Sequence, residues 1–542
     1  MRPNGFARDR DFDGTVLQDY DFGSSPTLHV PGDWNTQSDK LYYYEGILWY
    51  RRHFQYTLES GNRLFIRFEA SNYETVVFLN GKLLGVHEGG YTPFEYEITD
   101  NVISGDNSLV VRVDNKRRED GVPTLNTDWW NYGGITRSVY LVQTPSTFIR
   151  DYGIHVNPDN DRLVEGYVQL DGGETDQTVN ISIPELKINA KVQTDSNGYG
   201  SFSINSKPVL WDVDNPKLYD VILTSKDDKV KDQIGFRTIK TDGTKILLNG
   251  KEFFLAGINA HEETAFNSSR ANNAAQDAIL LQWAKDMGCN FVRLAHYPHN
   301  EDMVRTAEKM GLLIWSEIPL YWGIDWKNEK TYQLAEQQLE EMISRDHNRC
   351  NIIIWSIANE TAINPDRTAF LTRLAEKARS IDNTRLIAAA MQNREIEPLH
   401  MTLTDPLCDV LDILSFNEYI GWYDGPKDKC DKVKWTFPVD KPVVISEFGG
   451  GAKYGNFGSS EHYFTEDYLD ELYEHQFQML DRIPALAGTI PWVLKDFRSP
   501  HRLIPGIQDE FNRKGLYSDQ GQKKKAFYTV RAWNLRKTGK AE

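Results

Sequence analysis

The sequence predicts three consecutive domains, two β-sandwiches followed by a (β/α)8 barrel. Up to about residue 240, short alternating runs of apolar and polar residues are separated by turns. Beyond that point, continuous apolar runs alternate with helical patterns, which indicates βα units around a parallel sheet. We therefore expect the domains to span residues 1–146, 147–239 and 240–542.

The first two domains are predicted from their strand patterns. In residues 1–146 the strand-like runs are "TLHVPGDW" (27–34), "GILWYRRHF" (46–54), "NRLFIRFEA" (62–70), "ETVVFLNGKLLGVHEG" (74–89), "NSLVVRVDN" (107–115) and "RSVYLVQ" (137–143). The Asn-Gly within the fourth run favours a tight hairpin. Such spacing is typical of a jelly roll. A second, smaller sandwich of immunoglobulin-like size follows, with runs at 150–157, 163–172, 178–183 and 217–225.

The third domain contains eight candidate barrel strands. They are "EFFLAGINA" (252–260), "CNFVRLAHY" (289–297), "LLIWSEIPL" (312–320), "NIIIWSIANE" (351–360), "RLIAAAMQN" (385–393), "LDILSFNEY" (411–419), "KPVVISEFG" (441–449) and "LAGTIPWVLKDF" (486–497). Amphipathic helical segments lie between several of them, for example at 272–288, 332–348, 369–382 and 466–483. Eight strands over some 300 residues predict a closed (β/α)8 barrel.

Composition and charge exclude several classes of function. A formal net charge of −17 and a pI near 5.3 argue against a nucleic-acid partner. No run of 18 apolar residues is present, so we expect no membrane span. The four cysteines have neither C-x-x-C nor zinc-site spacing, so we expect buried thiols, no disulfide framework and no metal.

Polar side chains collect at the C-terminal ends of the predicted barrel strands, where barrels of this type carry their chemistry. The residues are Arg293, His296, His299, Glu317, Asn359, Glu360, Asn417, Glu418, Tyr419, Glu447, Trp492, Lys495 and Asp496. One polar strand end would be unremarkable, and a Glu there can simply form an ion pair. Six polar ends that converge on one mouth predict a functional site.

Glu360 and Glu447 follow the fourth and seventh strands, on opposite sides of the barrel mouth. Two carboxylic acids across a pocket are the minimal machinery for cleaving a glycosidic bond. One of them must deliver a proton while the other remains ionised. "HYPH" (296–299) offers two histidines to a metal, but no H-E-x-x-H motif accompanies them. We therefore expect no cofactor.

The three-domain order, "WSIANE" (355–360) and "SEFGG" (446–450) together resemble glycoside hydrolase family 2 over essentially the whole chain. This resemblance implies a retaining mechanism in which Glu360 is the acid/base and Glu447 the nucleophile. It also implies that Asn359 hydrogen-bonds the 2-hydroxyl group of the sugar. The buried fourth strand would thus end at the point where Glu360 faces the substrate.

Further motifs resemble the β-glucuronidases of that family. "FNRKGLY" (511–517) is similar to their N-x-K element, which implies that Asn512 and Lys514 bind the substrate carboxylate. "DWWNYGG" (128–134), "RLAHYPH" (293–299), "NEYIGWY" (417–423) and "PWVLKDF" (491–497) are similar to other elements of the same group. They imply substrate contacts by Asp128, His296, Tyr419, Tyr423 and Trp492.

Some features depart from these relatives. The segment after "EIPLYWG" (317–323) is short, which implies an open mouth suited to the ends of oligosaccharides or polysaccharides. Some relatives carry an arginine shortly before the N-x-K element, and Gln508 is the residue nearest to that position here. This replacement implies carboxylate recognition that is weaker or shaped for another uronate. No first jelly-roll strand is evident, so we expect an N-terminal truncation. The protein would be periplasmic or secreted if a signal was removed, and cytoplasmic otherwise.

The resulting hypothesis is an exo-acting β-glucuronidase, with a homodimer or homotetramer implied by the resemblance. The alternatives are a β-galactosidase or β-mannosidase of the same family, or a non-catalytic carbohydrate-binding protein. All of these take a carbohydrate partner.

Overall fold

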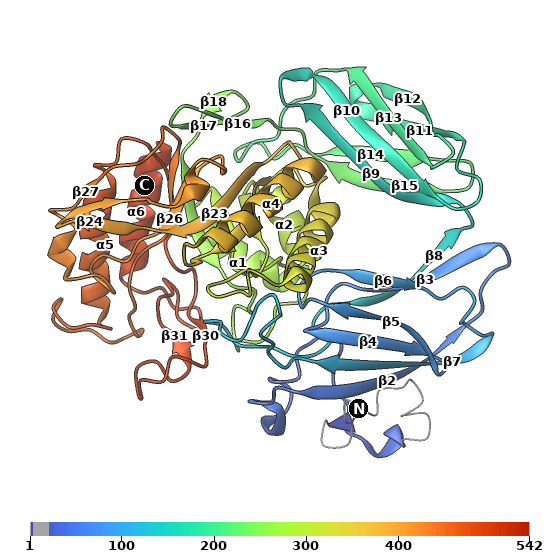
Figure 1. The fold of residues 1–542 in the computed structure, drawn as a ribbon, viewed down its shortest axis with the longest axis horizontal. Coiled ribbons are helices and arrows are strands. Elements are labelled where there is room, and N and C mark those ends of the chain that lie inside the picture. Colours follow the sequence, from blue (N-terminus) through green and yellow to red (C-terminus); the bar gives the residue numbers. More distant parts are fainter. Residues whose placement is uncertain (1, 4–20, 541–542) are drawn as a thin grey trace. The chain divides into compact units, whose positions relative to one another are not determined.

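In the computed structural model, residues 2–3 and 21–540 are described. Within this part, the chain forms two compact units. One contains Met1–Arg117, Asn131–Val209 and Leu218–Phe236, and the other Arg118–Trp130, Leu210–Lys217 and Arg237–Glu542. The first unit is built from strands, whereas the second holds the barrel and all the α-helices described (Figure 1).

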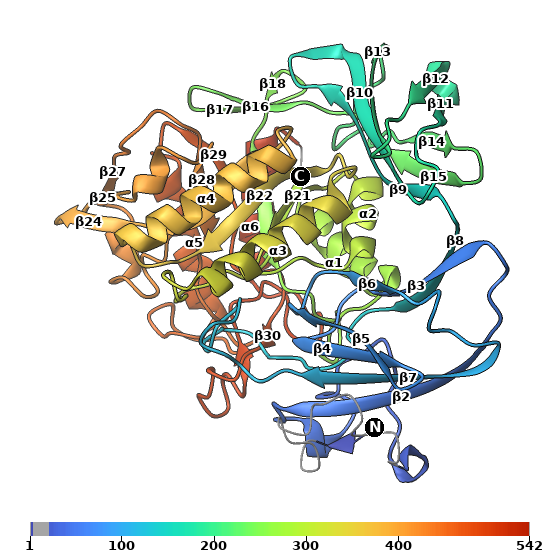
Figure 2. The ribbon, with the colours of Figure 1, turned by 45° about the vertical axis from the view of Figure 1, so that its right-hand side comes forward.

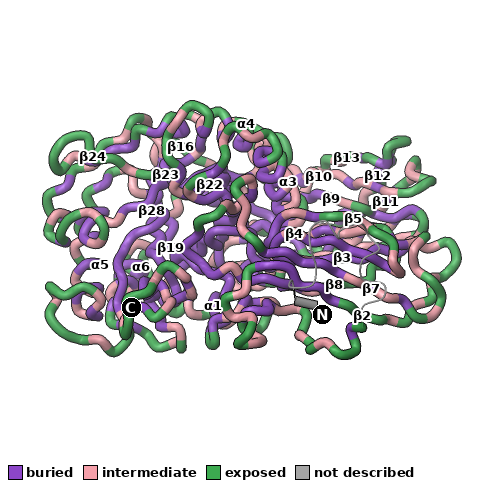
Figure 3. The backbone as a smooth tube through the Cα atoms, turned by 60° about the horizontal axis from the view of Figure 1, so that its bottom comes forward, coloured by how far each residue is buried: buried purple, intermediate pink, exposed green. Residues whose placement is uncertain are grey.

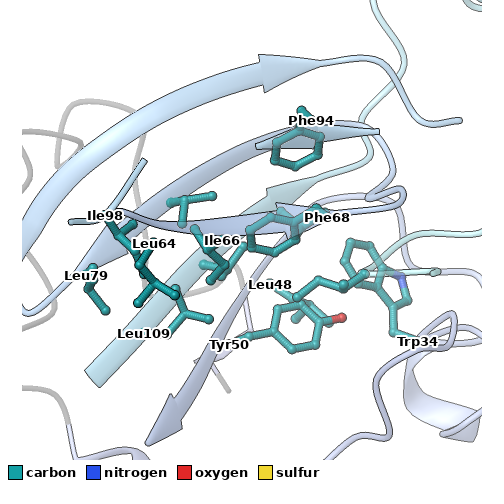
Figure 4. Packing of buried hydrophobic residues seen from close by; sticks show 14 residues of the cluster. Trp34, Leu48, Tyr50, Leu64, Ile66, Phe68, Leu79, Phe94, Ile98 and Leu109 are labelled. Carbon is teal, nitrogen blue, oxygen red and sulfur yellow. The ribbon is translucent and has the colours of Figure 1, made fainter. Parts of the chain in front are cut away.

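The first unit begins with a two-sheet sandwich. One sheet has the order β1-β2-β7-β4-β5 and the other β6-β3-β8. The strands are β1 (Arg2–Pro3), β2 (Ile47–Tyr56), β3 (Asn62–Phe68), β4 (Glu74–Leu79), β5 (Lys82–Glu88), β6 (Phe94–Glu97), β7 (Gly105–Asp114) and β8 (Val139–Pro145). Aliphatic and aromatic side chains from both sheets meet between them, and the rings of Phe68 and Phe94 stack with their centroids 4.9 Å apart (Figure 4). The expected sandwich is confirmed.

One expected strand of this sandwich is wrong. Residues 27–34 form irregular backbone with bends instead of a strand. Pro31 has no N–H for a ladder, and at the segment's end Gly32 N donates to the Ile135 carbonyl and Trp34 N to the Gly133 carbonyl. The segment nevertheless delivers the fully buried Trp34 to the core, which explains its apolar character.

A second sandwich follows in the same unit. Its sheets have the orders β13-β10-β9 and β12-β11-β14-β15. The strands are β9 (Phe148–Asn157), β10 (Asn160–Asp171), β11 (Thr178–Ile183), β12 (Ile188–Gln193), β13 (Tyr199–Asn205), β14 (Tyr219–Thr224) and β15 (Lys229–Ile234). All pairings are antiparallel, and inward residues alternate with outward ones along β11, as expected for a sandwich.

The second unit is a closed barrel of eight parallel strands in the order of the chain. The strands are β19 (Leu255–Ala260), β20 (Phe291–Leu294), β21 (Leu313–Glu317), β22 (Ile352–Asn359), β23 (Leu386–Gln392), β26 (Leu414–Asn417), β28 (Val443–Glu447) and β29 (Leu486–Thr489). Each lies within one of the eight predicted runs, so the barrel prediction is confirmed. β19, β22 and β28 are buried along their whole length, which explains their continuous apolar sequence (Figure 3).

Helices cover the outside of the barrel (Figure 2). They are α1 (Ala274–Asp286), α2 (Glu301–Met310), α3 (Glu329–Asp346), α4 (Pro365–Ile381), α5 (Glu466–Leu480) and α6 (Ala526–Thr538). An Asn or Thr side chain caps each of the first five by accepting backbone N–H groups, and thereby fixes where the helix starts. None of the described helices is long and apolar enough to cross a membrane. All four cysteines are buried and free.

Candidate active site

The end of β22 presents Asn359 and Glu360. The strand is buried up to Asn359, and Glu360 follows with a φ of 49°, a turn that takes its side chain out of the strand direction. Asn417 Nδ2 donates to Glu360 Oε1 at 2.8 Å, and Trp322 Nε1 donates to Glu360 Oε2 at 2.8 Å. Both oxygens of Glu360 are therefore held by neutral donors.

Glu447, at the end of β28, has a different environment. It is 5% exposed. Arg293 Nη1 donates to its Oε1 at 2.9 Å, and the Tyr419 hydroxyl donates to its Oε2 at 2.9 Å. Burial and the charge of Glu360 raise the pKa of Glu447, although Arg293 opposes both. The interaction between the two carboxyl groups places them in one site.

Arg293 organises the floor of this site. It is fully buried on β20 and donates to both oxygens of Glu317, at 2.9 and 3.0 Å. It also donates to Asn359 Oδ1 at 2.7 Å. Burial opposes ionisation of Glu317, yet Arg293 and His296 together lower its pKa to about 2. One guanidinium thus fixes the positions of Glu447 and Asn359.

Aromatic rings form the wall beside this network. The His296 and Trp492 rings stack with their centroids 4.8 Å apart and their planes at 20°. His296 Nδ1 lies 2.8 Å from Glu317 Oε1, and its Nε2 lies 3.9 Å from Glu447 Oε1. His296 and Trp492 are both nearly completely buried, which indicates a closely packed aromatic wall next to Glu447.

A short hairpin beyond the last barrel strand carries the N-x-K element. It pairs β30 (Phe497–Arg498) with β31 (Phe511–Asn512). Lys514 follows β31 and is 4% exposed, and its Nζ donates to the Tyr423 hydroxyl at 2.6 Å. The ammonium also lies 5.4 Å from the ring centre of Tyr419, which bonds Glu447. The basic group is thereby connected to the glutamate site.

Asp128 reaches the same region from the segment 118–130. Asn512 Nδ2 donates to its Oδ2 at 3.0 Å, and Ser499 Oγ donates to its Oδ1 at 2.6 Å. Arg502 contacts both of its oxygens, with Nε 3.0 Å from Oδ1. Burial raises the pKa of Asp128, but the Arg502 interaction outweighs burial and holds it below its usual value. Asp128 is therefore an ionised anchor for Arg502 and Asn512.

The residues expected at the substrate lie within the barrel unit and form two connected groups. The first surrounds the glutamates and contains His296, Asn359, Glu360, Tyr419, Glu447 and Trp492; the second contains Asp128, Tyr423, Asn512 and Lys514. Two other polar strand-end residues belong to the supporting scaffold. Asp496 is fully buried in an ion pair with Lys524 at 2.6 Å, and His299 Nε2 contacts the carbonyl of Ala295.

Three side chains at the site were not singled out by the sequence as substrate contacts. Asn417 was noted only as polar at a strand end, yet it bonds Glu360. Trp322 lies just after the third strand in "YWG", a position that a search of strand-end loops could have found. Arg502 belongs to a loop with no motif, so only the fold brings it to Asp128. Among the described residues, no group of three or more His, Cys, Asp or Glu could hold a metal ion.

Comparison with known proteins adds family information to this geometry. The family model described as "Glycosyl hydrolases family 2, TIM barrel domain" matches residues 239–532. The family's "sugar binding domain" matches residues 9–145, and a further domain model of the family matches residues 147–237.

Individual relatives cover most of the chain. A β-glucuronidase of Bacteroides fragilis is 30% identical over 94% of this chain and 79% of its own length. A longer protein of Formosa agariphila is 29% identical over 94% of this chain, which spans 66% of that relative. Among solved structures, a Bifidobacterium dentium β-glucuronidase complexed with coumarin-3-O-glucuronide superposes with a TM-score of 0.85. It is 25% identical, and the match covers 94% of this chain and 92% of that chain.

Proposed function

Because the chain belongs to glycoside hydrolase family 2, we propose that it is an exo-acting, retaining β-glucuronidase. Its substrates would be terminal β-D-glucuronides of oligosaccharides or polysaccharides. The relatives named β-glucuronidase support this activity. Glu447 is the nucleophile and Glu360 the acid/base. The substrate contacts come from Asp128, His296, Asn359, Tyr419, Tyr423, Trp492, Asn512 and Lys514.

The proposed reaction takes two steps. Glu447 attacks the anomeric carbon while the glycosidic bond breaks, and the proton of Glu360 passes to the departing oxygen, which leaves as an alcohol. Glu360, now a carboxylate, then takes a proton from water, and the resulting hydroxide attacks the same carbon. Glucuronic acid leaves, and Glu447 is regenerated. Arg293 and Tyr419 support the ionised form of Glu447 between turnovers.

The buried ammonium of Lys514 is the observation that supports the assignment of a uronate substrate. Its ammonium is nearly fully buried and donates to a neutral phenol. Within residues 21–540 no carboxylate lies within ion-pairing distance of it. A buried, unneutralised cation is unfavourable unless a ligand supplies the opposite charge. The C6 carboxylate of a uronic acid would supply it.

The test is hydrolysis of 4-nitrophenyl β-D-glucuronide compared with the β-D-galactoside and β-D-mannoside at equal concentrations. We expect the glucuronide to be cleaved with the highest kcat/KM. Preference for a neutral glycoside would favour the β-galactosidase or β-mannosidase alternative, with Glu360 and Glu447 in the same roles. Sugar binding without hydrolysis of any of them would favour a carbohydrate-binding protein.

Two further features belong to the proposal. We divide the chain into a jelly roll at 1–146, an immunoglobulin-like domain at 147–239 and the catalytic barrel at 240–542. We also propose a homodimer or homotetramer, which light scattering of the purified protein would distinguish from a monomer.

A further inference from the structure

Two cations line a small pocket at the barrel mouth. The pocket has a volume of about 240 Å³, and its lining includes Tyr423, Arg502, Asn512 and Lys514. Arg513, which also lines it, is neutralised by two aspartates, with Nη1 3.3 and 2.5 Å from their oxygens. Arg502 and Lys514 are therefore the cations that remain to be explained.

Arg502 and Lys514 converge on a single oxygen atom. Arg502 Nη1 donates to the Tyr423 hydroxyl at 3.2 Å, and Lys514 Nζ donates to the same hydroxyl at 2.6 Å. Burial raises the pKa of Tyr423, but the two neighbouring cations outweigh burial and lower it. The space around this oxygen thus favours negative charge, which a phenol supplies poorly at neutral pH.

Asp128 orients Arg502 and neutralises only part of this charge. Its carboxylate takes the Nε and Nη2 edge of the guanidinium, so Nη1 is the nitrogen directed at Tyr423. With Asp128 at −1 and both cations at +1, the group carries one net positive charge. One bound carboxylate brings the group to neutrality.

We propose that Arg502 is a specificity-determining residue, which shares the substrate carboxylate with Lys514 and is held in position by Asp128. The inference rests on the proposed function and deepens it. A second cation beside Lys514 selects uronides against neutral glycosides, because a neutral C6 group gains nothing from desolvating near two positive charges. The planar guanidinium also fixes the orientation of the carboxylate, which a lone ammonium does not.

The experiment compares kcat/KM for 4-nitrophenyl β-D-glucuronide and 4-nitrophenyl β-D-glucoside, and reports their ratio. We expect Arg502→Gln to lower the glucuronide-to-glucoside ratio roughly ten- to a hundredfold, mainly through KM, since one charge-assisted contact is lost. Arg373→Gln is the matched control. Arg373 pairs with Glu329 at 3.0 Å on the helical surface, so its ratio should equal that of the wild type.

Folding is checked first by thermal denaturation, because Arg502→Gln leaves Asp128 with one partner fewer. If that variant fails to fold, Arg502→Lys is used for the test instead. Lysine keeps a positive charge beside Asp128, but it lacks the second edge of N–H donors that arginine directs at Tyr423. We expect it to lower the ratio at least threefold. An unchanged ratio, or equal losses on both substrates, overturns the role of Arg502. Wild-type protein that cleaves no uronide at all overturns the proposed function instead.

Discussion

Replacing Glu360 by Gln removes a proton donor and a negative charge in one step, and the second effect can be worked out. Glu360 raises the pKa of Glu447 through its charge. A retaining pair of carboxyl groups is about 5 Å apart. At an effective dielectric constant of about 20, two unit charges at that distance repel by about 3 kcal/mol. This energy corresponds to a pKa shift of about two units, since one pKa unit is 1.36 kcal/mol.

The sign of the effect follows from the role of Glu447. A nucleophile must be ionised, so activity falls as the pH drops through the pKa of Glu447. The proposed acid carries its proton in that pH range, so Glu360 has no charge there and the acidic limb should stay in place in the variant. If Glu360 were ionised in that range, its replacement would move the acidic limb to lower pH. Because the carboxyl is only partly buried and its charge is screened, that shift would be about one unit instead of two.

The measurement is kcat/KM against pH with an aryl β-D-glucuronide whose leaving group needs little protonation. Such a substrate keeps the first step observable when the acid is missing. The substrate carboxyl also titrates in acid, so only the difference between wild type and variant is interpreted. Tryptophan fluorescence over the same pH range identifies the pH at which either protein unfolds. The basic limb, which reports the acid, should disappear in the variant.

An acidic limb that moves to lower pH would show that Glu360 is already ionised there, which would contradict its role as the acid. A shift to higher pH would show that Glu360 stabilises, instead of opposing, the ionised form of Glu447. Equal losses on aryl and alkyl glucuronides would contradict the role of Glu360 as the acid. The role predicts far larger losses with alkyl leaving groups, by up to about 10²- to 10⁴-fold.

Three further predictions address substrate recognition and stability. Lys514→Met should reduce kcat/KM on the glucuronide by roughly ten- to a few-hundredfold, from a charge-assisted contact of about 1.5–3 kcal/mol; a loss of similar size on a β-glucoside would contradict carboxylate recognition. Lys524→Met removes the nearer of the two cations that contact the fully buried Asp496, while Arg513 remains 3.3 Å away, and should lower the free energy of unfolding by about 1.5–3 kcal/mol. The control is Lys525→Met at the exposed neighbouring residue, which should change the free energy of unfolding by less than about 1 kcal/mol in urea titrations. Equal effects of the two substitutions would refute the argument. Glu418→Gln concerns a buried carboxyl whose pKa is raised by burial from 4.5 to about 8. Its contribution to stability is full below pH 4.5 and is lost as the pH rises towards 8, so the variant should lose less Tm than the wild type between pH 5 and pH 8. An equal loss of Tm between pH 5 and pH 8 in the variant and the wild type would contradict the raised pKa of Glu418.

Sequence periodicity predicted the barrel because each strand is enclosed on both sides and therefore has a continuous apolar sequence. β22 illustrates this, since every residue from Ile352 to Asn359 is buried. The same logic failed at residues 27–34, where apolar side chains serve the sandwich core but the backbone is irregular, with main-chain bonds from Gly32 and Trp34 to residues 133–135. The helix α2 (Glu301–Met310) was not predicted, because it is short and mostly polar in sequence.

The candidate site divides in the same way. Glu360 and Glu447 could be predicted because strand ends and motifs mark them in the sequence. Trp322 and Arg502 could not, since each reaches its partner from a separate loop, and Arg502 lies 374 positions from Asp128 along the chain. The sequence of one loop alone therefore cannot predict the contact between Arg502 and Asp128. Long-range contacts of this kind depend on how the barrel brings its loops together.

The contrast between the two glutamates gives a physical reason for the different roles proposed for them. Glu447 has a guanidinium fixed to one oxygen, and Arg293 is itself held by Glu317, so the cation cannot turn away without breaking a second ion pair. Glu360 has only an indole and an amide as donors, and no cation within ion-pairing distance in the described chain. Arg293 lowers the pKa of Glu447 and opposes the rise that burial and the charge of Glu360 cause, so it favours the ionised form. We infer that this contrast suits Glu447 to the proposed attack on the anomeric carbon, and suits Glu360, whose donors are neutral, to the proposed transfer of a proton.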